Sequence, residues 1–241
     1  MLYKNGSIIG VQNAASLGAA SGVWDLNAVQ QFREELTWPS VFVYQLLESR
    51  TGAGSANVYT QSTYSIGGTS IAGTTGRWVV HHRNTISFQC DVQYDSITLP
   101  TASGDVTYDF DSSAEGFETT ATAANPGQAI TDYLSATFSS VTTSSAGAMR
   151  FNRDSGGTQS SSTGGGAKSS GVGIDHSLGT TSGFYIYYEG SSAGSSSAPG
   201  SGFLRSPEVT LASTGTIEWY QSEHGSRLAD SVRDVYWIVS T

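Results

Sequence analysis

Three short stretches of the sequence contain residue types that could perform chemistry. The first, residues 164–169, reads GGGAKS and is similar to a phosphate-binding loop in having a glycine-rich run followed by lysine and serine. Such a loop needs glycine directly before the lysine and a helix after it, whereas Ala167 precedes Lys168 and the GVG at 171–173 opposes a helix. This stretch therefore does not predict a nucleotide site.

The second stretch, residues 190–194, reads GSSAG and matches the G-x-S-x-G pattern of serine hydrolases. Ser192 would be the nucleophile, with His224 and Asp230 as nominal partners. That pattern works on a sharp turn from a strand into a helix, but SSSAPGSG continues here and no βαβ alternation exists in the chain. An esterase using Ser192 stays an alternative, since a Gly- and Ser-rich sequence produces this match by chance.

The third stretch is YDFD at 108–111. If it is a strand, Asp109 and Asp111 lie on one face and both aromatic rings on the other. Two carboxylates together with loop carbonyls can begin a calcium site, because calcium takes several oxygen ligands. The alternative is a pair of solvated aspartates opposite an aromatic core face.

The histidines and the single cysteine do not predict a metal site. No H-x-x-x-H spacing occurs, and the adjacent His81 and His82 would point to opposite faces of a strand. Cys90 is the only cysteine, which excludes an intrachain disulfide and a Cys-based zinc site. The basic residues near His81–Arg83 and Arg150–Arg153 are interpreted as solvated strand ends.

The composition favours a folded β protein. Charged residues make up 13% of the 241 residues, aromatic residues make up 11%, and the 29 glycines favour turns between half-buried strands. A net charge of -9 argues against nucleic acid as a partner. The sequence contains no run of about 18 apolar residues, which a membrane-spanning helix would need, and its first residues do not resemble a signal peptide.

One short helix is expected from Asp25, which can cap its N-terminus, to the Trp38–Pro39 pair that ends it. An extended arm precedes this helix. Alternating segments predict strands at 40–47, 56–65, 77–82, 85–94, 105–110, 133–141, 148–152, 183–189, 202–211, 216–221 and 234–239. Many short strands separated by turn residues indicate a jelly-roll-like β-sandwich. We predict boundaries at 1–39 for arm and helix, 40–103 for a small β region, and 104–241 for the sandwich.

Five segments of the second half follow one another in a characteristic order. They are Asp109–Asp111, Phe151–Arg153, the loop ending at Asp175–His176, Gly183–Glu189 and Phe203–Pro207. The most specific parts are the R-x-S-G-x-T-x-S-S-x-T-G pattern that begins at Arg153, the Asp-His pair and the Ser-Pro pair. In this order the segments resemble MAM-like domains, and the resemblance covers about residues 104–222.

This resemblance implies an all-β jelly-roll sandwich that serves adhesion and recognition. It implies that residues 150–177 form a long ordered loop pinned by Arg153 and Asp175–His176; a disordered linker is the alternative. It also implies a structural cation, calcium, near Asp111 with Asp109 and Asp175 as neighbours, and no required cofactor. The chain departs from the pattern by lacking the disulfide cysteines of the animal domains, which indicates a microbial or viral variant.

In the N-terminal residues 7–39, an arm rich in Ala and Ser leads to Gly22–Trp24, a short helix and Trp38–Pro39. These residues resemble the first segment of tail-fibre and related virion proteins of aquatic bacteriophages. An amphipathic helix with two core tryptophans is the alternative, and it needs no viral explanation.

Together the two resemblances predict a non-enzymatic virion protein, namely a tail fibre, head fibre or decoration component. Residues 1–39 would attach to other virion proteins, and the chain would form a homo-oligomer, with a trimer favoured by analogy with fibres. The sandwich would bind host surface glycan or neighbouring subunits. The protein would reach the virion after synthesis in the host cytoplasm. The alternative is a carbohydrate-binding or adhesion module of a bacterial surface protein.

Overall fold

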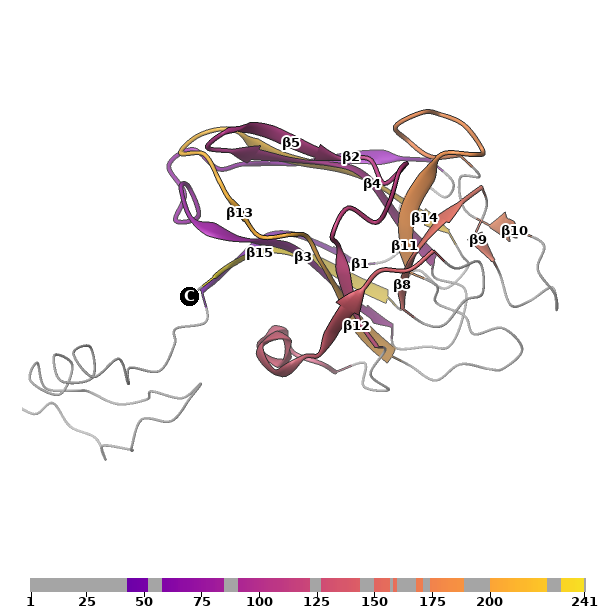
Figure 1. Cartoon of the computed structure of the whole chain (residues 1–241). Helices are drawn as coiled ribbons and strands as arrows, with labels where there is room; N and C mark the ends of the chain where they lie inside the picture. The colour runs from indigo at the N-terminus through magenta and orange to yellow at the C-terminus, as the bar shows by residue number, and fades with distance from the viewer. Residues whose placement is uncertain are drawn as a thin grey trace, which may run out of the picture. The chain divides into compact units, whose positions relative to one another are not determined.

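The computed structural model describes residues 43–51, 58–84, 91–121, 127–143, 150–156, 158–159, 168–170, 174–188, 200–224 and 231–240. These residues form two antiparallel sheets packed face to face, so the predicted β-sandwich is confirmed (Figure 1). The predicted arm and helix of residues 1–39 lie outside the described residues.

The first sheet has the strand order β1-β15-β3-β12-β6-β7, and β13 also pairs with β3. All of these pairings are antiparallel. The strands are β1 (Tyr44–Thr51), β3 (Thr75–Asn84), β6 (Glu118–Thr120), β7 (Phe138–Ser140), β12 (Gly200–Arg205), β13 (Val209–Thr210) and β15 (Ser231–Val239).

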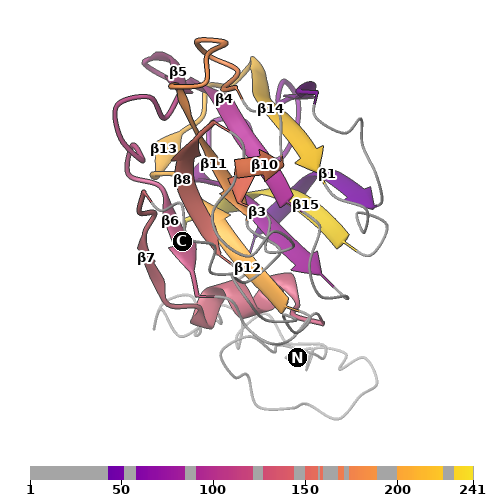
Figure 2. The same ribbon diagram turned by 90° about the vertical axis from the view of Figure 1, so that its right-hand side faces the viewer.

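The second sheet has the order β2-β14-β4-β11-β8, with β5 paired to β4. Its strands are β2 (Thr60–Ser65), β4 (Asp91–Thr101), β5 (Gly104–Tyr108), β8 (Phe151–Ser155), β11 (Phe184–Tyr188) and β14 (Thr216–His224). A separate ribbon pairs β9 (Thr158–Gln159) with β10 (Lys168–Ser170). Figure 2 shows the same elements turned by a quarter turn.

Several predicted strands differ in their bounds from the observed ones, and two of the differences have a clear physical cause. The segment at 133–141 begins inside a 3-10 helix, η1 (Ile130–Ser135), because the Asp132 carboxylate accepts the N–H of Ala129 at 2.9 Å and caps the turn. The segment at 202–211 divides into β12 and β13 around Pro207, which has no N–H to donate to a ladder. Within the described residues, no helix has the length and apolar character needed to cross a membrane.

The predicted boundary between residues 103 and 104 falls in the turn of the β4–β5 hairpin. Residues 44–103 supply strands to both sheets, and β3 lies between β15 and β12 of the later sequence. Residues 44–240 therefore form one compact unit rather than two. The composition change at 100–104 marks this tight turn, where Gly104 has a φ of +116° that suits glycine.

The sandwich interior changes character from one end to the other. On β3 the inward-facing residues Trp78 and Val80 join the apolar core, and alternation brings His82 and Asn84 to the same face further along the strand. β15 shows the same change from apolar to polar inward-facing residues, in the order Trp237, Val235, Arg233 and Ser231. β14 shows it in the order Ile217, Trp219, Gln221 and Glu223. One end of the interior is thus apolar, and we call the other the polar end.

Packing at the apolar end centres on Trp78. Its ring meets Trp219 at 6.0 Å, Tyr94 at 5.8 Å and Phe117 at 6.4 Å between centroids, in edge-on arrangements that aromatic rings prefer. Gly76 is required beside this cluster, because a Cβ there would lie 2.3 Å from the carbonyl oxygen of Ile238. Outside the sandwich, η1 covers the first sheet near β12 through Tyr133, whose ring is 5.6 Å from that of Phe203 (Figure 2).

Candidate functional site

The outer face of the second sheet carries a cluster built on a β-bulge. Tyr220 pairs with Asp95 and Glu218 pairs with Thr98, so β4 uses one residue more than β14 between these two pairs. The extra residue puts Ser96 in the left-handed region, with a φ of 48°. The bulge aims Asp95 and Ser96 at the loop that precedes β11.

Asp95 is fully buried and accepts three backbone N–H groups, two from this loop and one from its own strand. Its Oδ2 accepts the N–H of His176 at 2.7 Å and that of Ser177 at 3.3 Å, and its Oδ1 accepts the N–H of Ser96 at 2.6 Å. Burial raises the pKa of Asp95 to about 7, with the neighbouring Asp175 adding to the shift and the three N–H donors opposing it.

His176 is held in one orientation by contacts on several sides. Its Nδ1 lies 3.0 Å from the Ser96 hydroxyl, and its imidazole stacks on the Tyr220 ring with centroids 3.5 Å apart. Tyr59 contacts the same imidazole edge-on at 5.4 Å. Burial lowers the pKa of His176, although the Asp175 charge opposes this, so the imidazole is neutral at pH 7.

The predicted ligand Asp175 is buried and accepts hydrogen bonds from its own loop. Its Oδ1 accepts the N–H of Thr180 at 2.8 Å, and its Oδ2 accepts the N–H of Leu178 and the Ser177 hydroxyl. Burial acts to raise the pKa of Asp175, but these donors outweigh it and hold the pKa below its usual value. Gly183 is needed here because a Cβ would lie 2.1 Å from the Asp175 carboxyl carbon.

The predicted alternation of Asp109 and Asp111 on one strand is wrong. β5 ends at Tyr108, and Phe110 has a φ of 62°, because the Asp109 carboxylate accepts the N–H of Asp111 at 3.1 Å and forms a local turn. The predicted aromatic core face is still present, since Tyr108 and Phe110 both pack against Phe117.

The structure brings Asp111 and Asp175 together but not Asp109. Ser177 Oγ lies 2.9 Å from Asp111 Oδ2 and 2.7 Å from Asp175 Oδ2, and Asp111 Oδ1 accepts the N–H of Phe184 at 2.9 Å. Calcium takes six to eight oxygen ligands, which these converging oxygens do not supply, and the N–H donors around them disfavour a cation. Among the residues that the structure describes, no group of three or more His, Cys, Asp and Glu side chains is arranged to hold a metal ion. The calcium site stays a prediction that this geometry does not favour.

Arg153 fixes the other end of the long loop. Its guanidinium donates to the carbonyl oxygens of Phe110 at 2.5 Å and Asp111 at 2.6 Å and to the Thr143 hydroxyl at 3.2 Å, and it lies 3.5 Å from the centre of the Phe184 ring. Both ends of residues 150–177 are therefore anchored on the sandwich, as predicted. The interpretation of Arg153 as a solvated strand end is wrong.

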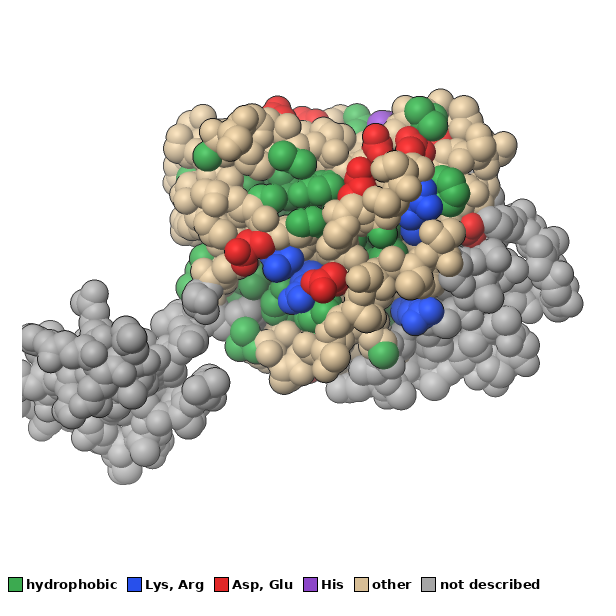
Figure 3. All heavy atoms as spheres, in the orientation of Figure 1, with side chains coloured by type: hydrophobic (Ala, Val, Ile, Leu, Met, Phe, Trp, Pro, Cys, Tyr) green, Lys and Arg blue, Asp and Glu red, His purple; other side chains and the backbone are tan. Residues whose placement is uncertain are grey.

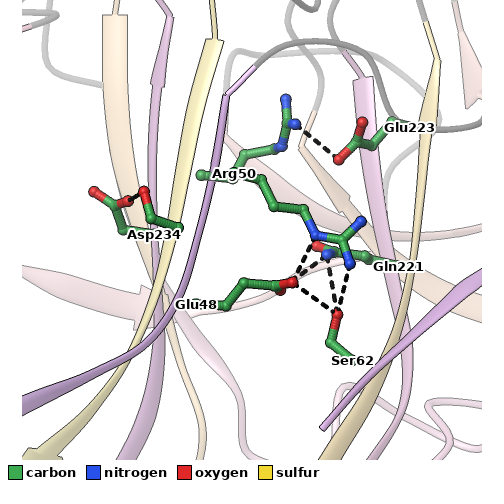
Figure 4. Close-up of polar contacts among 8 residues, drawn as sticks. Glu48, Arg50, Ser62, Gln221, Glu223 and Asp234 are labelled. Atoms are coloured by element: carbon green, nitrogen blue, oxygen red, sulfur yellow. Dashed lines mark hydrogen bonds and ion pairs between the residues drawn. The ribbon is translucent and has the colours of Figure 1, made fainter.

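A second polar network lies between the sheets at the polar end (Figure 4). Arg50 donates to Glu48 at 2.7 Å and to Ser62 at 2.9 Å, while Gln221 donates to Glu48 at 3.1 Å. These contacts join β1 of the first sheet to β2 and β14 of the second. A buried ion pair between Arg233 and Glu223, at 2.8 Å, makes a further connection between the sheets.

His82 lies in the same polar end and is completely buried. Its ring stacks on Tyr188 with centroids 4.0 Å apart, and among the described residues neither of its ring nitrogens has a hydrogen-bond partner. Burial and the charge of Arg233 keep the pKa of His82 well below its usual value. His82 is a neutral interior residue and His81 is buried as well, so the interpretation of this stretch as a solvated strand end is wrong for both histidines.

The remaining sequence candidates fall outside what the structure describes. Ser192 and Asp230 lie outside the described residues, as do the side chains of His224 and Lys168. On the face shown in Figure 3, acidic and basic side chains alternate in small groups, without a basic stripe of the kind that follows a nucleic-acid backbone.

Sequence reasoning missed the roles of Asp95 and Tyr220. A carboxylate within the strand-like segment QYDSITL was the available signal, because an acidic residue in a run that is otherwise strand-like needs partners from elsewhere.

Comparisons with protein families, with curated proteins and with solved structures found no match to this chain.

Proposed function

We propose that the chain is a non-enzymatic structural protein of a bacteriophage virion, such as a tail fibre, head fibre or decoration component. Residues 1–39 attach it to other virion proteins, and the sandwich binds host surface glycan or a neighbouring subunit. The N-terminal resemblance supplies the virion context, and the sandwich is a fold that presents binding surfaces without requiring catalysis.

One relationship between strands carries this proposal. Residues 1–43 join the sandwich at Tyr44, the register partner of Ile238 at one end of the first sheet. Four strands end at the opposite end of the sandwich, at Thr51, Asn84, Tyr188 and His224. The register shows this, because it pairs Thr51 with Val232, Asn84 with Ser231, Tyr188 with Val92 and His224 with Asp91. Residues 1–43 therefore join the sandwich at the end opposite to these four strand ends.

The edge strand β1 supports an assembled state. Tyr44 and Leu46 of β1 are 44% and 41% exposed, close to the point where residues 1–43 join the sandwich. Apolar side chains on an open edge strand are a liability in an isolated monomer. In the proposed homo-oligomer, a second copy of this chain covers them.

Light scattering tests the proposal by comparing the full chain with a variant that lacks residues 1–39. We expect the full chain to be a trimer or a larger assembly and the truncated chain to be a folded monomer. A folded monomer in both cases would overturn the virion proposal and favour the alternative, a carbohydrate-binding or adhesion module of a bacterial surface protein.

A further inference from the structure

We propose that the outer face of the second sheet binds a neutral sugar unit at a site formed by Gln61, Glu218, Tyr220 and His176, here called the Tyr220 site. The inference rests on the proposed function, which includes glycan binding. It goes further by assigning the residues and by naming the class of ligand as an uncharged, polyhydroxylated ring.

The sheet register places the site's polar groups around one aromatic ring. Ile217 and Trp219 face the core, so Glu218 and Tyr220 face outward on the same side of β14. Gln61 on β2 is the register partner of Tyr220, and its Nε2 lies 3.4 Å from Glu218 Oε2. This long contact at an exposed position is easily exchanged for hydrogen bonds to a ligand.

The opposite side of the ring is fixed in advance. His176 stacks on Tyr220, its Nδ1 is engaged by Ser96, and its backbone N–H is held by Asp95. Among the described residues, Nε2 of His176 has no hydrogen-bond partner, and in the proposed site it bonds a ligand hydroxyl. Because the bulge and the buried carboxylate already hold the imidazole in place, binding loses little side-chain entropy there.

The chemistry of this surface suits a sugar more than other ligands. Aromatic rings contact the apolar C–H face of a pyranose, while a carboxylate and an amide accept from and donate to its hydroxyl groups. The ligand class is uncharged because the net charge of -9 and Glu218 itself repel sulfated or sialylated chains. A single shallow site binds weakly, and repetition in an oligomer would raise the avidity.

An oligosaccharide array holding neutral, sialylated and sulfated members tests the site with the full chain. We expect retention on neutral members, and a loss of signal of about tenfold or more for Tyr220→Ala and for the double variant Gln61→Ala/Glu218→Gln. Glu208→Gln is the matched control, because Glu208 is an exposed carboxylate between β12 and β13 that accepts a hydrogen bond from the Ser240 hydroxyl. We expect this variant to bind like wild type.

Two kinds of result would overturn the site. The first is that the full chain is retained only on charged members of the array or on no member. The second is that the Tyr220→Ala chain and the double variant both bind like wild type while circular dichroism shows that they are folded. Light scattering on the same samples separates this failure from failure of the virion proposal, since assembly through residues 1–39 does not depend on Tyr220.

Discussion

Asp95 and His176 are 81 residues apart in sequence, and the buried carboxylate of Asp95 accepts the backbone N–H of His176 at 2.7 Å. This contact fixes the loop before β11 against the bulge of β4. The orientation of the His176 ring over Tyr220 depends on it, because the loop carries the imidazole to the sheet surface.

The raised pKa of Asp95 predicts a pH dependence of stability. Its pKa is about 7 in the fold against 3.8 in the unfolded chain, so the folded state binds more protons between these values. The stabilising contribution is present in full below pH 3.8 and is lost as pH rises through 7. Between pH 5 and 8, the free energy of unfolding of wild type should fall relative to Asp95→Asn by on the order of 1–3 kcal/mol. Urea titrations measure this, and parallel profiles for the two proteins would contradict it.

His82 predicts the opposite trend at lower pH. Its pKa in the fold is well below the unfolded value of 6.5, so protons bind preferentially to the unfolded chain, and stability falls as pH drops below about 6.5. Replacing His82 with Phe keeps a ring against Tyr188 and removes the titrating group. We expect the acid-unfolding midpoint of His82→Phe, followed by circular dichroism, to move to lower pH. A midpoint at or above that of wild type would show that other groups control acid unfolding.

The buried pair of Arg233 and Glu223 predicts strong coupling between the sheets. Arg233→Met leaves the Glu223 charge buried without its partner and should cost about 3–5 kcal/mol of unfolding free energy. Adding Glu223→Leu should recover much of that loss, since two apolar side chains can replace a buried ion pair. A double-mutant cycle by chemical denaturation measures the coupling. Additive single effects would mean that the two side chains do not interact energetically.

Metal removal tests the calcium prediction. Because the converging oxygens of Asp111, Asp175 and Ser177 fall short of a calcium ligand set, we expect EDTA to leave the melting temperature within about 1 °C of its value in calcium. Magnesium is the control for ionic strength. A drop of several degrees that only calcium reverses would establish the predicted ion.

The strands and the sandwich could be predicted because alternation of apolar residues is local information. Segments such as 216–221 and 234–239 correspond to β14 and β15 for this reason. The central position of β3 could not be predicted, because its neighbours β12 and β15 lie more than a hundred residues away in sequence. Composition at 100–104 therefore suggested a domain boundary where the chain only turns.

The candidate site was predicted only in part. The resemblance selected Asp111, Arg153 and Asp175–His176, and the structure shows that these residues anchor the loop. Asp95 and Ser96 were missed since a bulge depends on the pairing of β4 with β14, which a single strand's pattern does not reveal. His82 was assigned to the surface because polarity ordinarily marks exposure, whereas this sandwich keeps polar groups inside.

The change from an apolar to a charged interior sets where this fold opens first. Breathing of the sheets near Trp78 exposes interlocked aromatic surface to water, whereas near Arg233 and His82 it returns polar groups to a solvent that stabilises them. Amide hydrogen exchange should therefore be graded along each strand, slowest at the tryptophans. We therefore expect the polar end of the sandwich to open locally, without global unfolding, before the aromatic end does.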